Sequence, residues 1–174
     1  MERSTSQIDT TTGVEENFFP SPARCGHALI SITSVRATQF IDITDRIGAL
    51  VAASHISQGI VNVQALHTTT AIVVNEHEPL LLTDFEAALG RIVPTDALYR
   101  HDDPHLRVVN LAPNERRNGH SHCRALLLTP SLSLNIVGGR LVLGRWQRLF
   151  FVELDGPRER AISTLMMGEG GGRR

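Results

Sequence analysis

The chain has 174 residues, a length that suits one domain with a sizeable core. Hydrophobic residues make up 41% of the chain and charged residues 20%, the composition of an ordinary soluble globule. Because 17 basic side chains oppose 18 acidic ones, the formal net charge is -1, and no overall field draws the protein to nucleic acid or to a membrane surface. We therefore expect neither kind of partner, and a phosphorylated ligand would need a local site.

The cysteines and the lengths of the apolar runs indicate in which cellular compartment the protein is expected. Cys25 and Cys123 lie far apart, form no CxxC motif and follow no secretory-type segment, which favours a reducing compartment. The longest apolar runs, such as residues 125–128, fall far short of the roughly 20 residues that a membrane helix requires. We expect a cytoplasmic protein.

The two ends of the chain lack the periodicity of folded elements. Residues 1–24 are rich in Ser, Thr, Glu and Pro, and residues 169–174 are mostly Gly and Arg. The composition predicts a flexible N-terminal arm over 1–24, one domain over 25–168 and a flexible tail over 169–174.

Hydrophobic periodicity predicts the elements of the first half. Alternation in residues 27–35 indicates a strand, and helical spacing predicts a helix over 42–54. Residues 60–75 are β-branched and alternating, which predicts one long or kinked strand. A second helix is predicted over 79–93, with Pro79 in its first turn.

The second half is mostly β. Residues 94–117 form a polar, proline-containing connection whose length is typical of functional loops. A short helix is predicted over 121–128, then strands over 131–137, 140–146, 147–155 and 159–167, with Gly138-Gly139 as a hairpin turn. The predicted fold class is α+β, with mainly antiparallel sheets and two to three helices.

Histidines are the leading candidates for a functional site. His67 ends an alternating segment and precedes three threonines, of which Thr69 is the central one, so hydroxyl donors surround it. His101 is followed by Asp102, whose carboxylate can fix the tautomer of an imidazole or ligate a divalent cation. A satisfied structural histidine and a solvated turn explain the same residues.

His120 and His122 form an HxH pair within NGHSHCRA. In a strand the two side chains would share one face, whereas at a helix start they diverge by about 200°. Since apolar residues follow directly, we expect a helix to begin nearby, and we rank His122 above His120 as a pocket residue.

His67, His101 and His122 match the number of protein ligands in a catalytic zinc site, so Zn or Mg is a candidate cofactor. They equally fit a phosphate or pyrophosphate clamp, since imidazole serves either purpose. The residues alone do not choose between these two sites.

Four further positions are candidates. Glu76 can serve as a general base or metal ligand, or is a solvated strand end. Trp146, beside Gln147, can stack on a pyrimidine-like ring, or belongs to the core or an interface. Arg158 can hold phosphate through two hydrogen bonds, or is part of a charged surface turn.

Several separate blocks of the chain carry a resemblance. HTTTAIVVNEHEPLLLTDFEAAL, YRHDD, NGHSHCRALLL and GGRLVLGRWQRLFFVELDGPRER resemble, in order and spacing, the YjbQ family, also described as secondary thiamine-phosphate synthases. The resemblance covers about residues 30–168. It implies a compact α+β fold, a homotrimer, and a polar pocket lined by histidines, acids and the Asn75-Glu76 pair.

Two functional hypotheses follow. The first is a transferase-like enzyme that handles a small phosphorylated metabolite. Its nearest activity, implied by the resemblance, is thiamine-phosphate synthase, with His67, Glu76, His101, His122 and Arg158 as catalytic residues and Thr69, Asn75, Asp102, Trp146 and Gln147 as binding residues. The second is a non-catalytic trimer that binds a metal or a phosphometabolite. The motifs GxxxxGK[ST], GxGxxG, GxSxG and HExxH do not occur, which disfavours the enzyme classes that depend on them.

Overall fold

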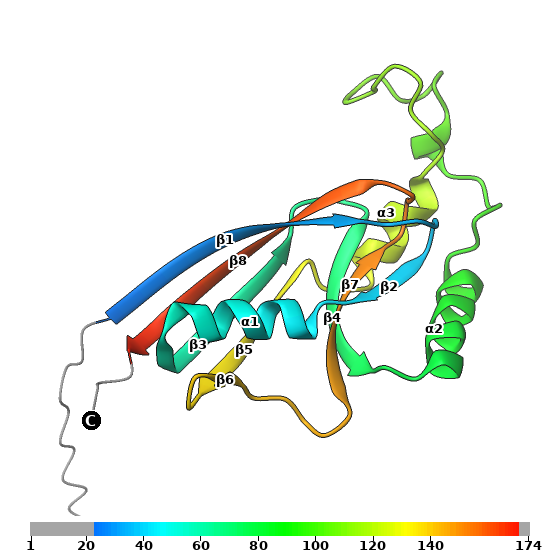
Figure 1. Ribbon diagram of the computed structural model, residues 1–174. Coiled ribbons are helices and arrows are strands. Elements are labelled where there is room, and N and C mark those ends of the chain that lie inside the picture. The colour runs from blue at the N-terminus through cyan, green and yellow to red at the C-terminus, as the bar shows by residue number, and fades with distance from the viewer. Residues whose placement is uncertain (1–22, 171–174) are drawn as a thin grey trace, which may run out of the picture.

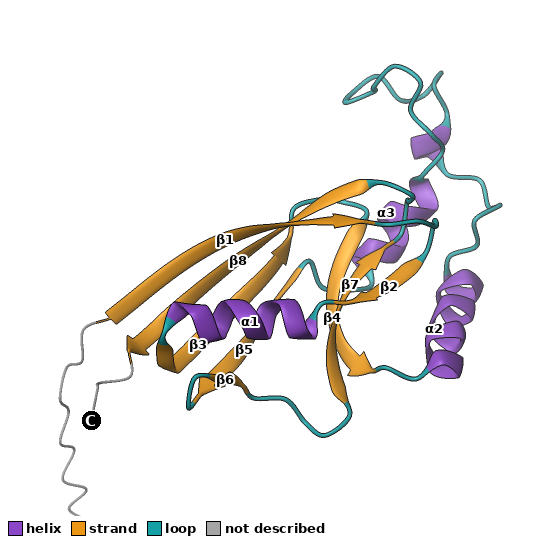
Figure 2. Cartoon of the chain, viewed as in Figure 1, coloured by secondary structure: helices purple, strands orange, loops and turns teal. Residues whose placement is uncertain are grey.

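The computed structural model describes residues 23–170 (Figures 1 and 2). Residues 23 and 24 of the predicted arm and residues 169 and 170 of the predicted tail belong to strands. The remainder of the arm and tail lies outside the described residues. No helix within residues 23–170 has the length and apolar character needed to cross a membrane.

The larger of two sheets has five strands in the order β1-β8-β3-β5-β6. They are β1 (Ala23–Thr33), β3 (Ile56–Ala65), β5 (Ser131–Val137), β6 (Arg140–Leu141) and β8 (Glu159–Gly170). Every neighbouring pair is antiparallel, and β8 pairs with β1 along one edge and with β3 along the other. The Gly138-Gly139 hairpin between β5 and β6 is confirmed: both glycines have positive φ, as such a turn requires.

The smaller sheet has three antiparallel strands in the order β2-β7-β4. They are β2 (Gln39–Asp42), β4 (Thr70–Glu76) and β7 (Gln147–Glu153). Successive side chains of β7 point to opposite faces, and Leu149, Phe150, Phe151 and Val152 are all fully buried. The sheet therefore separates two apolar layers, and the predicted α+β class with mainly antiparallel sheets is confirmed.

The α-helices of the described residues cover both faces of the smaller sheet. Helix α1 (Thr44–Ser54) buries Ile47 and Val51 in the core between the two sheets. Helices α2 (Pro79–Ile92) and α3 (Gly119–Leu126) pack on the opposite face of the smaller sheet, where Leu89 lies in the same apolar cluster as Phe150. A short 3-10 helix, η1 (Arg100–Asp102), lies in the connection between α2 and α3.

Two predicted strands differ clearly from those observed, and the short strand β2 was not predicted. The single strand over 60–75 is wrong, because the chain leaves the larger sheet after Ala65 and enters the smaller one at Thr70. A tight turn joins β3 to β4, and in it Thr70 Oγ1 donates to the carbonyl of His67 at 3.0 Å. The strand over 140–146 stops at Leu141, since the Gln147 side chain accepts from Gly144 N and holds a loop.

One face of the larger sheet is covered by no helix of residues 23–170 and is unusually poor in charge. Alternate residues of β1, β8, β3 and β5 point outward, opposite the buried Ile30, Ile162 and Val61. The outward side chains form three consecutive rows across these strands: Cys25, Met167, Ile60 and Asn135; His27, Leu165, Asn62 and Ser133; Leu29, Ser163, Gln64 and Ser131. These rows contain no Asp, Glu, Lys or Arg, although such residues usually dominate solvated sheet faces.

Candidate functional site

A polar cavity of about 460 Å³ lies where four parts of the chain meet. The β3–β4 turn contributes His67 and Thr69, and the α2–α3 connection contributes His101, Arg107 and Glu115. The first turn of α3 adds Asn118 and His122, while the β7–β8 turn and the start of β8 add Asp155, Arg158 and Arg160. The structure thus brings together His67, His101, His122, Arg158 and Thr69, five of the residues predicted from sequence.

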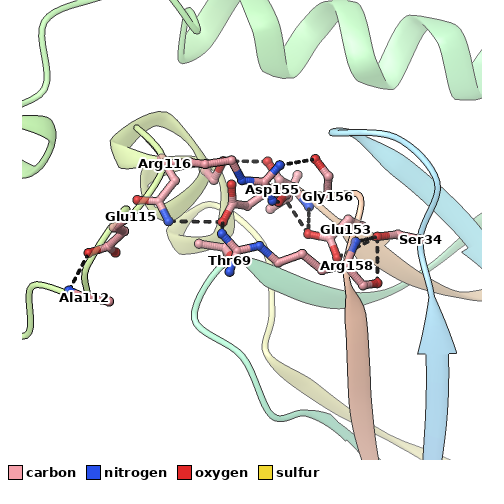
Figure 3. A network of polar contacts seen from close by, with 12 residues as sticks. Ser34, Thr69, Ala112, Glu115, Arg116, Glu153, Asp155, Gly156 and Arg158 are labelled. Carbon is pink, nitrogen blue, oxygen red and sulfur yellow. Dashed lines mark hydrogen bonds and ion pairs between the residues drawn. The ribbon is translucent and has the colours of Figure 1, made fainter.

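A buried ion pair between Glu153 and Arg160 underlies this cavity, and Figure 3 shows Glu153 among its polar neighbours. Glu153, the last residue of β7, is completely buried and receives Arg160 Nε and Nη2 on its two oxygens, each at 2.7 Å. The backbone N–H groups of residues 154 and 155 and the Ser34 hydroxyl also donate to Glu153. Burial raises the pKa of Glu153, but the hydrogen bonds from Arg160 and from the backbone outweigh burial and lower it, so the carboxylate stays ionised.

The β7–β8 turn aims Arg158 at the cavity. Its backbone N–H donates to Ser34 Oγ, and its Nη2 pairs with Asp155 Oδ2 at 3.0 Å. Asn118 Nδ2 donates to the same Asp155 oxygen, which orients the Asn118 amide. Arg158 Nε and Asn118 Oδ1 are buried and have no hydrogen-bond partner within residues 23–170. Buried polar atoms without partners are uncommon and mark positions where a ligand can complete the bonding.

His67 lies in the β3–β4 turn, with one ring nitrogen directed at β8. The backbone N–H of Ala161 donates to His67 Nε2 at 3.0 Å. Burial lowers the pKa of His67, the nearby Arg160 and Arg158 lower it further, and Glu153 opposes them. The imidazole is therefore neutral at pH 7.

His101 and His122 approach each other from η1 and α3. Their ring centroids are 4.6 Å apart. Arg107 donates from Nη1 to His101 Nε2 at 3.0 Å and pairs with Glu115 at 2.9 Å, so this arginine links the two ends of the connection. Burial, followed by His101, lowers the pKa of His122, which is therefore also neutral at pH 7.

The HxH pair is divided between two cavities. Because α3 begins at Gly119, the two histidines diverge as helix geometry requires. His122 lines the cavity described above, whereas His120 and Asp102 line a second one of about 510 Å³. Asp102 Oδ1 accepts from Asn118 N and Gly119 N, at 3.0 and 2.8 Å, and so caps the start of α3.

Four predicted site residues lie elsewhere in the described chain. Glu76 pairs in register with Gln147 at the end of β4, and Asn75 precedes Glu76. This end of β4 is roughly 20 Å from His67, given the rise of an extended strand. Trp146 is 60% exposed, with the Arg145 guanidinium 4.6 Å from its ring centroid. Within a single chain, four predicted site residues therefore lie away from the cavity: Asn75, Glu76, Trp146 and Gln147.

The three-histidine metal site does not fit the arrangement of donors well. Within residues 23–170, no group of three or more His, Cys, Asp and Glu side chains is placed to hold a metal ion. His67 Nε2 and His101 Nε2 already accept hydrogen bonds, so neither nitrogen is open to a metal.

Sequence reasoning missed several cavity residues. Arg107 and Glu115 lie in the long polar connection, where nothing but its length indicated a role. Asn118 begins the block NGHSHCRALLL, which carries the family resemblance, but it was not singled out. Glu153 lies in the apolar run LFFVEL and was not singled out. An acidic residue inside a run this apolar indicates a buried carboxylate that needs a partner, and this signal was available in the sequence.

Comparison with known proteins places the chain in a family. Residues 28–169 match the family model described as UPF0047 protein YjbQ-like. The chain belongs to the UPF0047 family of YjbQ-like proteins. A UPF0047 protein of Methanothermobacter thermautotrophicus is 39% identical over 140 residues, which are 80% of this chain and 90% of that protein. UPF0047 protein YugU of Bacillus subtilis is 30% identical over 139 residues, 80% of this chain and 97% of YugU.

Solved structures agree with this assignment. A YbjQ-like protein of unknown function from Sulfolobus solfataricus has a TM-score of 0.75 and 32% identity, covering 84% of this chain and 99% of that one. A hypothetical protein from Aeropyrum pernix K1 has a TM-score of 0.72 and 32% identity, covering 83% and 99%. The UPF0047 fold thus extends over nearly all of the described residues.

We predict that Glu153→Ala destabilises the protein by about 3–5 kcal/mol, because Arg160 is left as a buried charge without its partner. Urea unfolding followed by circular dichroism measures the change. Arg36→Ala, which removes an exposed pair with Glu86, is the matched control and should cost less than about 1 kcal/mol. Equal losses in the two variants would contradict a special role for the buried pair.

We also predict that acid weakens the fold through its partly buried histidines. The folded-state pKa values of His67, His120 and His122 are lowered, first by burial, so below about pH 6.5 the unfolded chain binds more protons than the folded one. The unfolding free energy should therefore fall as the pH drops from 7.5 to 5.5. His122→Gln should show a shallower fall, and the exposed His105→Gln should match the wild type. An unchanged slope in His122→Gln would refute this origin.

Proposed function

We propose that this UPF0047 protein is a cytoplasmic enzyme whose cavity holds the phosphate or pyrophosphate of a small metabolite. The supporting observation is the convergence of three histidines and the guanidinium groups of Arg107, Arg158 and Arg160 on one hollow. Arginine and imidazole N–H groups are suited to phosphate oxygens. A volume of about 460 Å³ has room for a phosphoryl group with a small ring attached.

The nearest describable reaction is the thiamine-phosphate synthase reaction that the family resemblance implies. In it the C–O bond of a pyrimidine-methyl pyrophosphate breaks and pyrophosphate departs with the electron pair. The nitrogen of a thiazole phosphate then forms the new C–N bond at the same methylene carbon. Arg158, with its unpartnered Nε, would neutralise the departing charge, and His122 would help to orient the leaving group. The reaction requires no nucleophile from the protein.

We expect Arg158→Ala to lower the rate of thiamine-phosphate formation by about 10²–10³, the usual cost of removing a donor to developing charge. His122→Ala should lower it in the same direction. Product is measured by chromatography after incubation with both precursors. Arg145→Ala, on the loop before β7, removes an arginine outside the cavity and is the control.

A non-catalytic role is the alternative, in which the same cavity only binds a phosphometabolite. Absence of product with the wild-type protein, together with retained phosphate binding, would favour that role over the enzyme.

The homotrimer implied by the resemblance has support in the uncharged sheet face. Interface centres are depleted of charged residues, as are the three outward rows. Leu29, Ile60, Leu165 and Met167 are between 37% and 67% exposed on this face, among uncharged polar side chains. We propose that copies of the chain assemble through it.

If this face joins the subunits, Leu165→Lys should convert the trimer to monomers, because a buried ammonium without a partner is costly. Light scattering coupled to size-exclusion chromatography gives the mass. Leu80→Lys, on the exposed side of α2, is the control and should leave the mass unchanged. An undiminished mass in Leu165→Lys would place the interface elsewhere.

A further inference from the structure

The ring nitrogens that remain free on the cavity histidines determine what the cavity can bind. A neutral imidazole has one N–H donor and one lone pair, and a metal ion needs the lone pair. On His67 the lone pair is on Nε2, because that atom accepts the Ala161 N–H at 3.0 Å. The ring proton is therefore on Nδ1. Metal binding at Nδ1 would move this proton to Nε2, where it would face the N–H of Ala161.

His101 is constrained in the same way by a different donor. Its Nε2 lies 3.0 Å from Arg107 Nη1, and a guanidinium has only donors. The lone pair of His101 must therefore be on Nε2 and its proton on Nδ1. Two of the three histidines thus offer N–H groups rather than lone pairs, and only His122 remains as a ring ligand for a metal.

The other polar groups around the cavity are of both kinds. Thr69 and Arg158 are donors, the carboxylates of Glu115 and Asp155 are already paired with arginines, and Asn118 Oδ1 is a buried acceptor without a partner within residues 23–170. Thr69 is 4% exposed, and its Oγ1 accepts from Arg160 Nη2, which leaves its own hydrogen free to donate. Arg158 Nε is buried and without a partner among residues 23–170.

We infer that the cavity binds a phosphoryl group directly through N–H and O–H donors, including His67 Nδ1 and the Arg158 guanidinium, with no divalent cation between protein and phosphate. This inference takes from the proposed function the presence of a phosphoryl group in the cavity. It adds the chemistry of recognition: a free oxyanion is the ligand, not a metal complex of it.

Calorimetric titration of the full chain with inorganic phosphate tests the inference, first in EDTA and then with Mg²⁺ or Zn²⁺. We expect the same Kd, within about twofold, in all three conditions. Arg158→Ala should weaken binding about tenfold or more, as removal of a charged hydrogen bond does, and Arg145→Ala should not. Phosphate binding that requires a divalent cation, or that survives Arg158→Ala unchanged, would overturn the inference.

The substitution His67→Gln separates the roles of the two ring nitrogens of His67. Gln carries a carbonyl that can replace Nε2 as the acceptor for Ala161 N–H, but it lacks the Nδ1 donor. We therefore expect His67→Gln to unfold at the wild-type urea concentration and to bind phosphate about tenfold more weakly. Wild-type phosphate affinity in a folded His67→Gln would show that Nδ1 does not contact the ligand, and would count against the inference.

Nitrogen-15 NMR of the histidine rings reads the tautomers without any ligand. His67 and His101 should both be protonated at Nδ1, with or without added Zn²⁺. Zinc-induced shifts in the rings of all three histidines would instead establish a metal site. Since none of these measurements requires turnover, loss of the synthase activity and loss of metal-free phosphate binding are separate results.

Discussion

The buried contact between Glu153 and Arg160 is the constraint on which the geometry of the cavity depends. An unpaired carboxylate in the interior costs several kcal/mol, so the fold must supply donors to both oxygens of Glu153. It does so from β8, from the backbone after β7 and from Ser34 after β1. Ser34 in turn accepts the backbone N–H of Arg158, and Arg160 donates to Thr69. One buried charge thereby fixes the positions of two side chains that face the ligand.

Local periodicity was enough to predict most elements, because their apolar faces meet one continuous core. Helices α1 and α2 and the strands flanking Gly138-Gly139 were found in this way. The break between β3 and β4 was not, since residues 60–75 alternate without interruption. The position of the break is determined by which distant strands the two segments pair with: β3 pairs with β8 and β5, whereas β4 pairs with β7. A window along the sequence carries no information about such partners.

The types of residue in the candidate site could be predicted from the sequence, but which of them meet in one cavity could not. Imidazole and guanidinium groups identified His67, His101, His122 and Arg158, which the fold collects from two turns, the 3-10 helix η1 and helix α3. The family resemblance implied that Asn75 and Glu76 share a pocket with the histidines, but β4 is extended and carries them to the end of the sheet away from His67. His120 and His122 are only two residues apart, but because they lie on a helix their side chains face different cavities. The distance in space between two nearby residues therefore depends on whether they lie on a strand, a helix or a turn.

Residue type also leaves open what a histidine cluster binds, because the same ring serves a metal or an anion. The choice depends on the partner of the second nitrogen, and in this protein secondary structure supplies that partner. The Ala161 N–H belongs to β8, next to the turn that holds His67. The Arg107 guanidinium is held by its pairing with Glu115 across the α2–α3 connection. Since both are donors, each forces a lone pair toward itself and leaves an N–H on the other side of the ring. The backbone of a strand and one loop arginine thus turn two potential metal ligands into hydrogen-bond donors.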